Sequence, residues 1–379
     1  MGVGMQPDLP PAMTDPSLAG GRVTVDLGAL VSNWRMLAQR AGSAATAAVV
    51  KGDAYGVGLE AAARALAEAG CQTFFVALPE EGIRLRAAVR DATIYVLNGL
   101  MPECAAVYVS TKLRPVLSTW SEIEEWAELR RNGVNIGSAV HVDTGMHRLG
   151  LTPGQARKLS QEPDLLAAIS PDLIMSHIAC ADTPEHNLNR KQLAAFRAVC
   201  VLLPGIPASL ANSAGIMLGH DYHFDLVRPG IALYGGGFVG GTSPLQPVVT
   251  LEARVLQIRD IKSGEPVGYG AAETVAQDSR IAIVAVGYAD GYHRRAGSSD
   301  EQAGARAFLH GHHVPLVGRV SMDLIAIDVT GLSGVVRGDW VELIGPNVPL
   351  DEVAYHAGTI GYELLTGLGS RYSRRYIGP

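Results

Sequence analysis

Basic clusters, cysteine pairs and long apolar stretches are all scarce in this chain of 379 residues. Its formal net charge is −6 and it has no run of Lys or Arg, so nothing indicates binding to nucleic acid or to an anionic membrane surface. No apolar run approaches the ~20 residues that a membrane-spanning helix needs. The sequence therefore predicts a soluble protein that binds neither nucleic acid nor membrane.

The four cysteines, at positions 71, 104, 180 and 200, are scattered and form no C-x-x-C pair. This spacing is typical of reduced thiols in a cytosolic protein rather than of a disulfide framework or a zinc site. Residues 1–21 are rich in Pro, Gly and Met, and they lack the cationic start and apolar segment of a signal peptide. We expect a flexible tail over residues 1–21, no bound metal and a cytoplasmic location.

Hydrophobic residues make up 47% of the chain, and over residues 22–240 they form short apolar runs that alternate with helical patterns. The run 46–50 is too short for a helix and predicts a buried strand, and 59–69 predicts the helix that follows it. Such runs predict about eight strands, the number typical of a (β/α)8 (TIM) barrel, with a doubly wound open sheet as the alternative. The other predicted strands are 73–78, 93–97, 115–117, 139–142, 173–175, 208–210 and 225–227.

The pattern changes after residue 240. Strand-like runs at 249–255, 281–286, 314–317, 324–329 and 340–344 are separated by Gly-Asp and Gly-His turns. We therefore predict an α/β class protein: an N-terminal TIM barrel over residues 22–240 and a C-terminal, mostly-β domain over residues 241–379.

Reactive groups of such barrels lie at the C-terminal ends of the strands. Lys51, one of only five lysines, follows the strand predicted at 46–50 and alone ends an apolar strand. A buried lysine loses its charge readily and attacks aldehydes, which favours a Schiff-base role. A lysine that extends from the barrel rim into water explains the same position equally well.

Further polar residues follow the later strands. Ser213 and Gly230 follow the seventh and eighth strands, where barrel loops commonly bind phosphate. Taken singly, an N-cap serine and a turn glycine are the ordinary explanations, but together they favour phosphate. Arg228 needs partners if it is buried. A lone histidine such as His177 is more often structural than catalytic. A role as a turn residue also explains Asn212.

These residues also carry a resemblance to a known family. Residues 48–56, Ala-Val-Val-Lys-Gly-Asp-Ala-Tyr-Gly, are similar to the pyridoxal phosphate attachment signature of alanine racemases. The similarity covers nearly the whole chain beyond the tail and implies an isomerase that interconverts L- and D-alanine, the latter a peptidoglycan precursor. Its further motifs, in the same order, are 143–146, 148–150, 212–214, 228–231, 234–235, 268–271, 286–291, 318–323 and 362–363.

The resemblance implies two opposed bases. Lys51 would hold pyridoxal phosphate as an imine and act as one base, and Tyr269 would be the other. A racemase needs a base on each face of a planar carbanion, so that a proton removed from one side can be returned to the other. Tyrosine titrates near 10, so a nearby cation must lower its pKa. Without the resemblance, Tyr269 reads as a strand tyrosine at a sheet surface.

The same resemblance implies the other site residues. Arg228 would face the pyridine nitrogen, with His177 hydrogen-bonded behind it, and would discourage protonation of that nitrogen. Arg148 would contact the ring hydroxyl and the substrate carboxylate, with Tyr288 and Met322 on the substrate side. The phosphate would be held by Tyr55, Ser213, Gly230, Ile231 and Tyr362, with Asn212 as a further cofactor contact.

The resemblance further implies a homodimer in which each active site is shared between subunits. Lys51 would come from one subunit, and Tyr269, Tyr288 and Met322 from the other. The sequence itself shows only that these two sets lie in different predicted domains.

Five positions depart from the family pattern. His141 stands where many members have a lysine that becomes carbamylated and steadies the active-site arginine, so Arg148 must be held differently. Val57 replaces a common histidine, 272–273 replace a usual Thr-Tyr, and Ser321 replaces a common cysteine. None of these changes removes a predicted catalytic group, but they leave substrate breadth and rate open.

Three other functions remain as alternatives. A racemase of broader or shifted specificity, for example for serine, is compatible because a pocket rarely rejects an added hydroxyl strongly. A pyridoxal phosphate-dependent decarboxylase of the same fold is disfavoured, because related decarboxylases carry a carboxylate where this chain has Arg228. A non-catalytic barrel that binds the cofactor would need no second domain with Tyr269.

Overall fold

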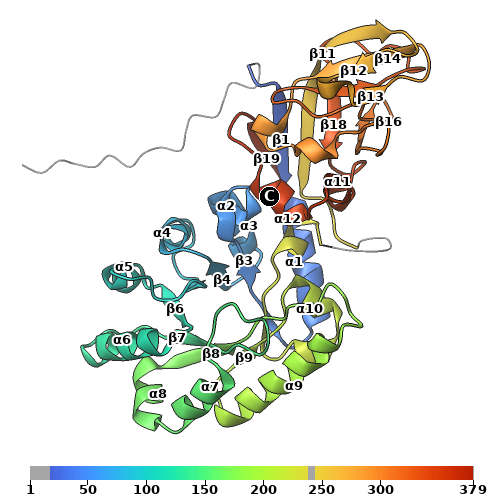
Figure 1. Ribbon diagram of the computed structural model, residues 1–379. Helices are drawn as coiled ribbons and strands as arrows, with labels where there is room; N and C mark the ends of the chain where they lie inside the picture. The colour runs from blue at the N-terminus through green and yellow to red at the C-terminus, as the bar shows by residue number, and fades with distance from the viewer. Residues whose placement is uncertain (1–17, 238–243, 379) are drawn as a thin grey trace, which may run out of the picture. The chain divides into compact units, whose positions relative to one another are not determined.

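The computed structural model describes residues 18–237 and 244–378, which form two compact units (Figure 1). One unit is Leu27–Val248, called here the barrel unit. The other, called the β unit, combines the described residues up to Asp26 with Val249–Ile377. The tail predicted for residues 1–21 lies mostly outside the described residues, and Gly21 already begins a strand.

Parallel strands in sequence order form the centre of the barrel unit. Each strand from β3 to β9 is hydrogen-bonded in parallel to the next along the chain, and helices lie on the outer side (Figure 1). This order never reverses, which excludes the doubly wound sheet. The strands are β3 (Ala48–Val49), β4 (Thr73–Val76), β5 (Thr93–Val96), β6 (Arg114–Leu117), β7 (Ser138–His141), β8 (Pro171–Met175) and β9 (Ala208–Ser209).

The ring is closed by β10 (Leu226–Val227), which pairs in parallel with β2 (Ala45–Thr46), the segment that leads into β3. The Asp225 N–H donates to the Ala208 carbonyl on one side, and the Ala47 N–H donates to the Val227 carbonyl on the other, both at 3.0 Å. With β2 and β3 taken as one interrupted strand, eight positions surround the axis. The predicted TIM barrel is therefore confirmed.

The helices of the barrel unit cover the apolar strands. In α6, Thr119 and Glu122 form a capping box at the start, and Ile123 and Trp126 are buried on one face. The helices are α1 (Leu27–Ala41), α2 (Lys51–Tyr55), α3 (Leu59–Glu68), α4 (Pro79–Ala88), α5 (Ala105–Thr111), α6 (Trp120–Arg131), α7 (Pro153–Ser160), α8 (Pro163–Ile169), α9 (Asn187–Leu202) and α10 (Ser213–Met217), with the 3-10 turns η1 (His220–Tyr222) and η2 (Ile231–Tyr234).

The β unit is built around β11 (Val249–Ile261), a strand of 13 residues. A register shift between Val255 and Gln257 bends it, so that its first part pairs with β1 (Gly21–Asp26) and its last part with β14 (Ser279–Val284). The other strands are β12 (Pro266–Val267), β13 (Glu273–Thr274), β15 (Arg306–Leu309), β16 (His312–Pro315), β17 (Ile325–Asp328), β18 (Trp340–Ile344) and β19 (Ser373–Ile377).

Strand β1 lies between β11, to which it is antiparallel, and β19, to which it is parallel. Residues 22–26, which the sequence assigns to the barrel domain, therefore belong to the β unit in the structure. Two helices, α11 (Leu350–Ala357) and α12 (Gly361–Thr366), and the 3-10 turns η3 (Tyr269–Ala271), η4 (Tyr288–Asp290) and η5 (Arg294–Ala296) complete this unit.

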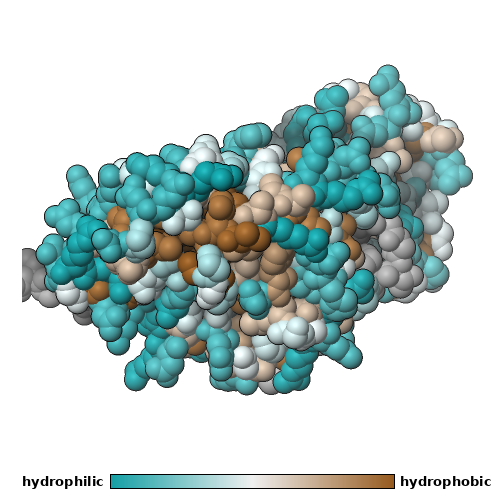
Figure 2. Space-filling model, turned by 90° about the horizontal axis from the view of Figure 1, so that it is seen from below, coloured by the Kyte–Doolittle hydropathy of each residue, from teal (hydrophilic) through white to brown (hydrophobic). Residues whose placement is uncertain are grey.

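Hydrophilic residues cover most of the face shown in Figure 2, and hydrophobic residues gather in one area of it. Among residues 18–237 and 244–378, no helix combines the length and the apolar character needed to cross a bilayer.

One buried amide links the start of the barrel unit to its end. Asn33, on α1 and 1% exposed, donates to the Leu233 carbonyl at 3.1 Å and to the Gln246 carbonyl at 2.8 Å, and it accepts from the Gln246 N–H at 2.7 Å. We predict that Asn33→Ala lowers the free energy of unfolding by about 2–4 kcal/mol, because three backbone groups lose their partner. Urea denaturation measures this loss, with exposed Arg35→Ala as the control; equal stabilities of the two variants would contradict it.

Candidate active site

The chain makes a left-handed turn directly after Lys51. The φ angles are 63° at Gly52, 54° at Asp53 and at Ala54, and 56° at Tyr55. This conformation costs about 1–2 kcal/mol for each residue that carries a Cβ. Runs of such residues persist only where their surroundings hold them, and they concentrate at functional sites. Sequence reasoning missed this turn; its glycine-rich motif was the available signal.

Burial and charge act on the Lys51 amine. Burial is the main cause of a lowered pKa, and the positive charge of Arg148 adds to it, while the carboxylate of Glu81 opposes both. The fraction of neutral, nucleophilic amine therefore rises. Lys51 is only partly exposed, unlike a lysine that extends from the rim into water, and this burial favours a Schiff-base role for its amine.

A cradle of small and hydroxyl groups lies beside this turn, at the ends of β9 and β10. Ser213 Oγ accepts hydrogen bonds from the backbone N–H of Gly230 at 2.8 Å and of Ala232 at 3.2 Å. A Cβ added at Gly230 would lie 2.2 Å from Tyr55 Oη, so only glycine fits there. Tyr55 in turn stacks on Tyr234, with 4.7 Å between ring centroids.

The cradle therefore brings together residues that are far apart in the sequence. Asn212 caps α10 by accepting from the Gly215 N–H at 2.9 Å, which places Ser213 at the N-terminus of that helix. Ile231 is buried and begins η2. Of the predicted phosphate contacts, Tyr362 alone lies in the other unit, on α12.

Arg228 is buried at the end of β10, at 3% exposure. Its guanidinium donates to the Ser209 hydroxyl, to the Ser176 carbonyl at 2.6 Å and to the Leu210 carbonyl at 3.4 Å. Burial lowers its pKa to about 9, and its hydrogen-bond partners among the described residues are all neutral. A cation buried among neutral acceptors still stays protonated at neutral pH.

His177 lies near Arg228, but the hydrogen bond expected between them is not formed. Burial, followed by the charges of Arg228 and Arg148, lowers the pKa of His177 to about 3. The imidazole is therefore neutral at pH 7. The guanidinium of Arg228 instead binds backbone carbonyls and the Ser209 hydroxyl, which already satisfy it on that side.

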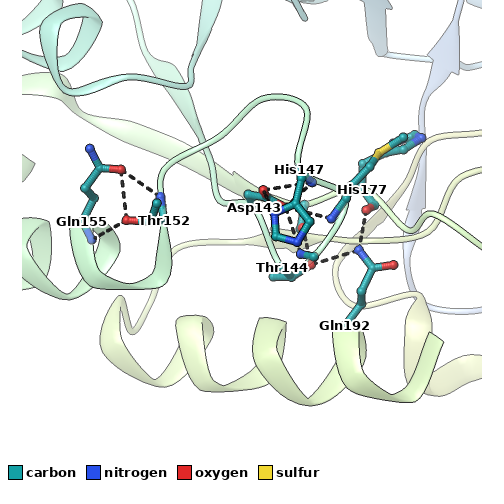
Figure 3. A network of polar contacts seen from close by, with 10 residues as sticks. Asp143, Thr144, His147, Thr152, Gln155, His177 and Gln192 are labelled. Atoms are coloured by element: carbon teal, nitrogen blue, oxygen red, sulfur yellow. Dashed lines mark hydrogen bonds and ion pairs between the residues drawn. The ribbon is translucent and has the colours of Figure 1, made fainter. Parts of the chain in front are cut away.

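A buried glutamine joins the two loops that carry Arg148 and His177. Gln192, on α9 and fully buried, donates to Thr144 Oγ1 at 3.3 Å and to the His177 carbonyl at 2.9 Å (Figure 3). Its own oxygen accepts from the Ala179 N–H at 2.9 Å. Sequence reasoning missed Gln192, and a polar residue among the apolar positions of a helix was the only signal.

The loop between β7 and Arg148 is organised by Asp143. Its carboxylate accepts from the backbone N–H groups of residues 145, 146 and 147 at 2.8–3.2 Å (Figure 3). The Arg148 side chain is exposed, and within 18–237 and 244–378 no hydrogen bond or ion pair holds it. This loop is therefore ordered while its arginine is left available for a ligand.

His141 occupies the position where the family commonly has a modified lysine. It is 7% exposed, with Nδ1 at 3.5 Å from Ser118 Oγ. Burial, then the charges of Arg228 and Arg148, lower its pKa to about 4. A neutral imidazole therefore occupies the position at which a carbamylated lysine would carry a negative charge.

The remaining predicted residues lie in the β unit. Tyr269 begins η3 and is 69% exposed, while Tyr288 and Met322 are 42% and 53% exposed. The Tyr288 N–H donates to the Ser321 carbonyl at 3.0 Å, which brings Tyr288 beside Met322. A Cβ at Gly270 would lie 2.9 Å from Arg319 Nη1, so a cation lies beside the turn that bears Tyr269.

The residues of the barrel unit fit pyridoxal phosphate. An amine of lowered pKa suits its aldehyde, and a glycine-hydroxyl cradle at the N-terminus of α10 suits its phosphate. Buried Arg228, whose partners within residues 18–237 and 244–378 are neutral acceptors, suits an unprotonated ring nitrogen. Within the described part of the chain, no group of three or more His, Cys, Asp or Glu side chains is placed to hold a metal ion.

Comparison with known proteins agrees with this fit. Residues 25–237 match the family described as alanine racemase, N-terminal domain, and residues 248–376 match alanine racemase, C-terminal domain. Alanine racemase of Rhizobium meliloti is 50% identical over 369 residues, covering 95% of this chain and 97% of that protein. The biosynthetic alanine racemase of Agrobacterium fabrum is 47% identical, covering 94% and 93%.

A solved structure is similar along its whole length. Alanine racemase from Bartonella henselae, with covalently bound pyridoxal phosphate, superposes with a TM-score of 0.88 at 42% identity. The alignment covers 95% of this chain and 100% of that one.

The low pKa of His141, about 4, predicts a pH effect on stability. Between pH 4 and the ordinary histidine value near 6.5, the unfolded chain binds more protons than the folded one, so stability is lost as the pH falls. His141→Asn cannot titrate and should lose about 2 kcal/mol less between pH 7 and pH 5. Urea denaturation at both pH values measures this, with exposed His312→Asn as the matched control. Equal pH slopes in the His141 variant and the unchanged protein would contradict the burial of a neutral imidazole.

Proposed function

The chain belongs to the alanine racemase family, whose members use pyridoxal phosphate, and we propose that it interconverts L- and D-alanine with that cofactor. The observation that carries the proposal is the position of Lys51. Its amine, with a lowered pKa, ends a barrel strand beside the cradle of Ser213 and Gly230 and near the buried Arg228.

The chain's own residues supply the proton transfers. Pyridoxal phosphate, when bound, supplies a carbonyl for amines and an electron sink for the α-carbon. Lys51 takes or gives the α-proton on one face of the substrate, and Tyr269 does so on the opposite face. A proton removed by one base and replaced by the other inverts the configuration. Arg319 lies beside the turn that bears Tyr269.

Arg228 directs the chemistry toward racemisation. A guanidinium donates hydrogen bonds and cannot accept a proton, so an atom that faces it stays unprotonated. Arg228, at the position where related decarboxylases carry a carboxylate, argues against the decarboxylase alternative. His177, held neutral beside it, adds no competing charge.

Arg148 and two residues of the β unit are proposed to bind the substrate. The exposed guanidinium of Arg148 suits a carboxylate, and Tyr288 and Met322 offer a small apolar surface. This surface suits the methyl group of alanine, and serine is the main rival because a pocket discriminates weakly against an added hydroxyl.

We further propose a homodimer in which each site is shared. Tyr269, Tyr288, Met322 and Tyr362 are among the large hydrophobic side chains exposed on the β unit. Exposed hydrophobic side chains that form a contiguous patch mark a surface that binds another protein, and these four are the candidates for such a patch. A two-fold dimer would give the Lys51 of each subunit the Tyr269 of the other.

A cytoplasmic location and a role in supplying D-alanine for peptidoglycan complete the proposal. All four cysteines are free thiols, as expected in a reducing compartment. A biosynthetic relative at 47% identity and a catabolic one at 45%, both from Agrobacterium fabrum, are about equally similar to the chain.

The racemase assignment predicts solvent exchange at the α-carbon. In heavy water the protein should convert L-alanine to a racemic mixture that carries deuterium at that carbon, because a solvent-exchanged base returns the proton. Lys51→Ala should lose this activity and the borohydride-reducible visible absorbance. Optical rotation, mass spectrometry and absorbance are the measurements. Loss of rotation without deuterium would contradict the racemase, and a parallel run with L-serine tests the specificity.

Subunit mixing tests the shared site. Lys51→Ala and Tyr269→Phe should each be inactive alone, while Tyr269→Phe keeps its bound cofactor. Mixed and re-equilibrated in equal amounts, they should recover roughly a quarter of the wild-type activity, because half the dimers then contain one intact site of two. A mixture that stays inactive, although mass spectrometry detects mixed dimers, would show that both bases come from one chain.

A further inference from the structure

The left-handed turn after Lys51 is fixed by a carboxylate from the neighbouring helix. Glu81 Oε1 accepts a hydrogen bond from the backbone N–H of Gly52, the first residue of the turn, at 2.6 Å. Glu81 Oε2 accepts from the N–H groups of Ala77 and Leu78 at the start of α4, at 2.8 and 3.1 Å. One carboxylate therefore ties two successive βα loops of the barrel together.

A second contact from α4 holds the next residue of the turn. Arg84, three residues after Glu81, donates to Asp53 Oδ1 at 2.6 Å and to both oxygens of Glu60 at 2.7 and 2.9 Å. Residues three apart share one face of a helix. This face of α4 therefore binds the first two residues of the left-handed turn, Gly52 through Glu81 and Asp53 through Arg84.

We propose that Glu81 is a positioning residue, which holds the left-handed turn so that the Lys51 amine is presented to the cofactor. This inference rests on the proposed role of Lys51. The turn closes backbone hydrogen bonds of its own, from the Ala54 N–H to the Val50 carbonyl at 2.9 Å and from the Gly56 N–H to the Gly52 carbonyl at 2.7 Å. The N–H of Gly52 next to the lysine is instead bound by Glu81, which attaches the strained turn to α4. The carboxylate also lies close enough to raise the pKa of Lys51 against the effects of burial and Arg148.

The barrel offers an internal control of the same geometry. Glu122 caps α6 in the same way, because its Oε2 accepts from the N–H groups of Ser118 and Thr119, both at 2.8 Å. Its Oε1 accepts from the N–H of Leu100, in the preceding βα loop, at 3.0 Å. No predicted site residue lies on that loop. Glu122 therefore caps its helix and links two βα loops as Glu81 does, but it makes no contact with the turn after Lys51.

The test compares Glu81→Gln with Glu122→Gln as purified holoenzymes. Glu81→Gln should weaken retention of pyridoxal phosphate about tenfold, because a charge-assisted hydrogen bond next to Lys51 is lost. It should lower kcat for alanine by about as much, with KM within about twofold. Glu122→Gln should lose comparable resistance to urea but keep cofactor retention and kcat. Loss of visible absorbance on dilution measures retention.

Further variants keep the outcome decisive. Glu81→Asp keeps the charge and can still cap α4, but it is one methylene too short to reach Gly52 as well, so it should share the defect in retention. Exposed Glu80→Gln should change nothing. Equal effects of Glu81→Gln and Glu122→Gln on retention, or unchanged retention in Glu81→Asp, would overturn the positioning role. If Lys51→Ala keeps its reducible absorbance, the proposed function fails instead, whatever Glu81 does.

Discussion

Closure of the barrel by backbone hydrogen bonds is the constraint on which the rest of the structure depends. The N–H groups of Ala45, Ala47 and Val49 donate to the carbonyls of residues 225, 227 and 229 at 2.8–3.0 Å. These bonds join the first strand position to the last, so that Lys51 and Arg228 reach the same end of the ring. Parallel strands cannot pair through short turns, and the crossover helices are therefore obligatory.

Closure also concentrates positive charge. Lys51, Arg148 and Arg228 lie close enough to affect the titration of His177, and His141 is subject to the same two arginines. Burial holds both histidines neutral, and Arg228 binds only neutral groups among the described residues. A site of this kind favours a ligand that brings negative charge, such as a phosphate and a carboxylate. In many other family members a carbamylated lysine supplies a negative charge at the position of His141. Here His141 is neutral, so the ligand has to supply the negative charge.

The fold and the barrel half of the site could be predicted because their signals are local. Apolar runs gave the strands, and Lys51, Ser213 and Gly230 directly follow them. The resemblance supplied Tyr269, which spacing alone would have left as a surface residue. The placement of Tyr269 against a substrate stays a prediction, because Tyr269 lies in the β unit and Lys51 in the barrel unit.

What could not be predicted depends on partners distant in sequence. Strand β1 has no local feature that assigns it to β11, more than 220 residues later. The attachment of Gly52 to Glu81 and the junction at Gln192 also link separate loops. A left-handed run of Asp53, Ala54 and Tyr55 opposes local preference, so propensities predict its opposite. Tertiary contacts override the local preference at these positions.

The position of β1 has a consequence for how the chain is made. Because β1 pairs with β11 and β19, the barrel unit is in effect an insertion between the first strand of the β unit and its remainder. On the ribosome, the barrel unit can fold as soon as residue 248 has emerged, and β1 can then pair with residues 249–253 of β11, whereas its other edge must wait for residues 373–377. The first strand of the described residues thus keeps one open edge until the last strand has been synthesised.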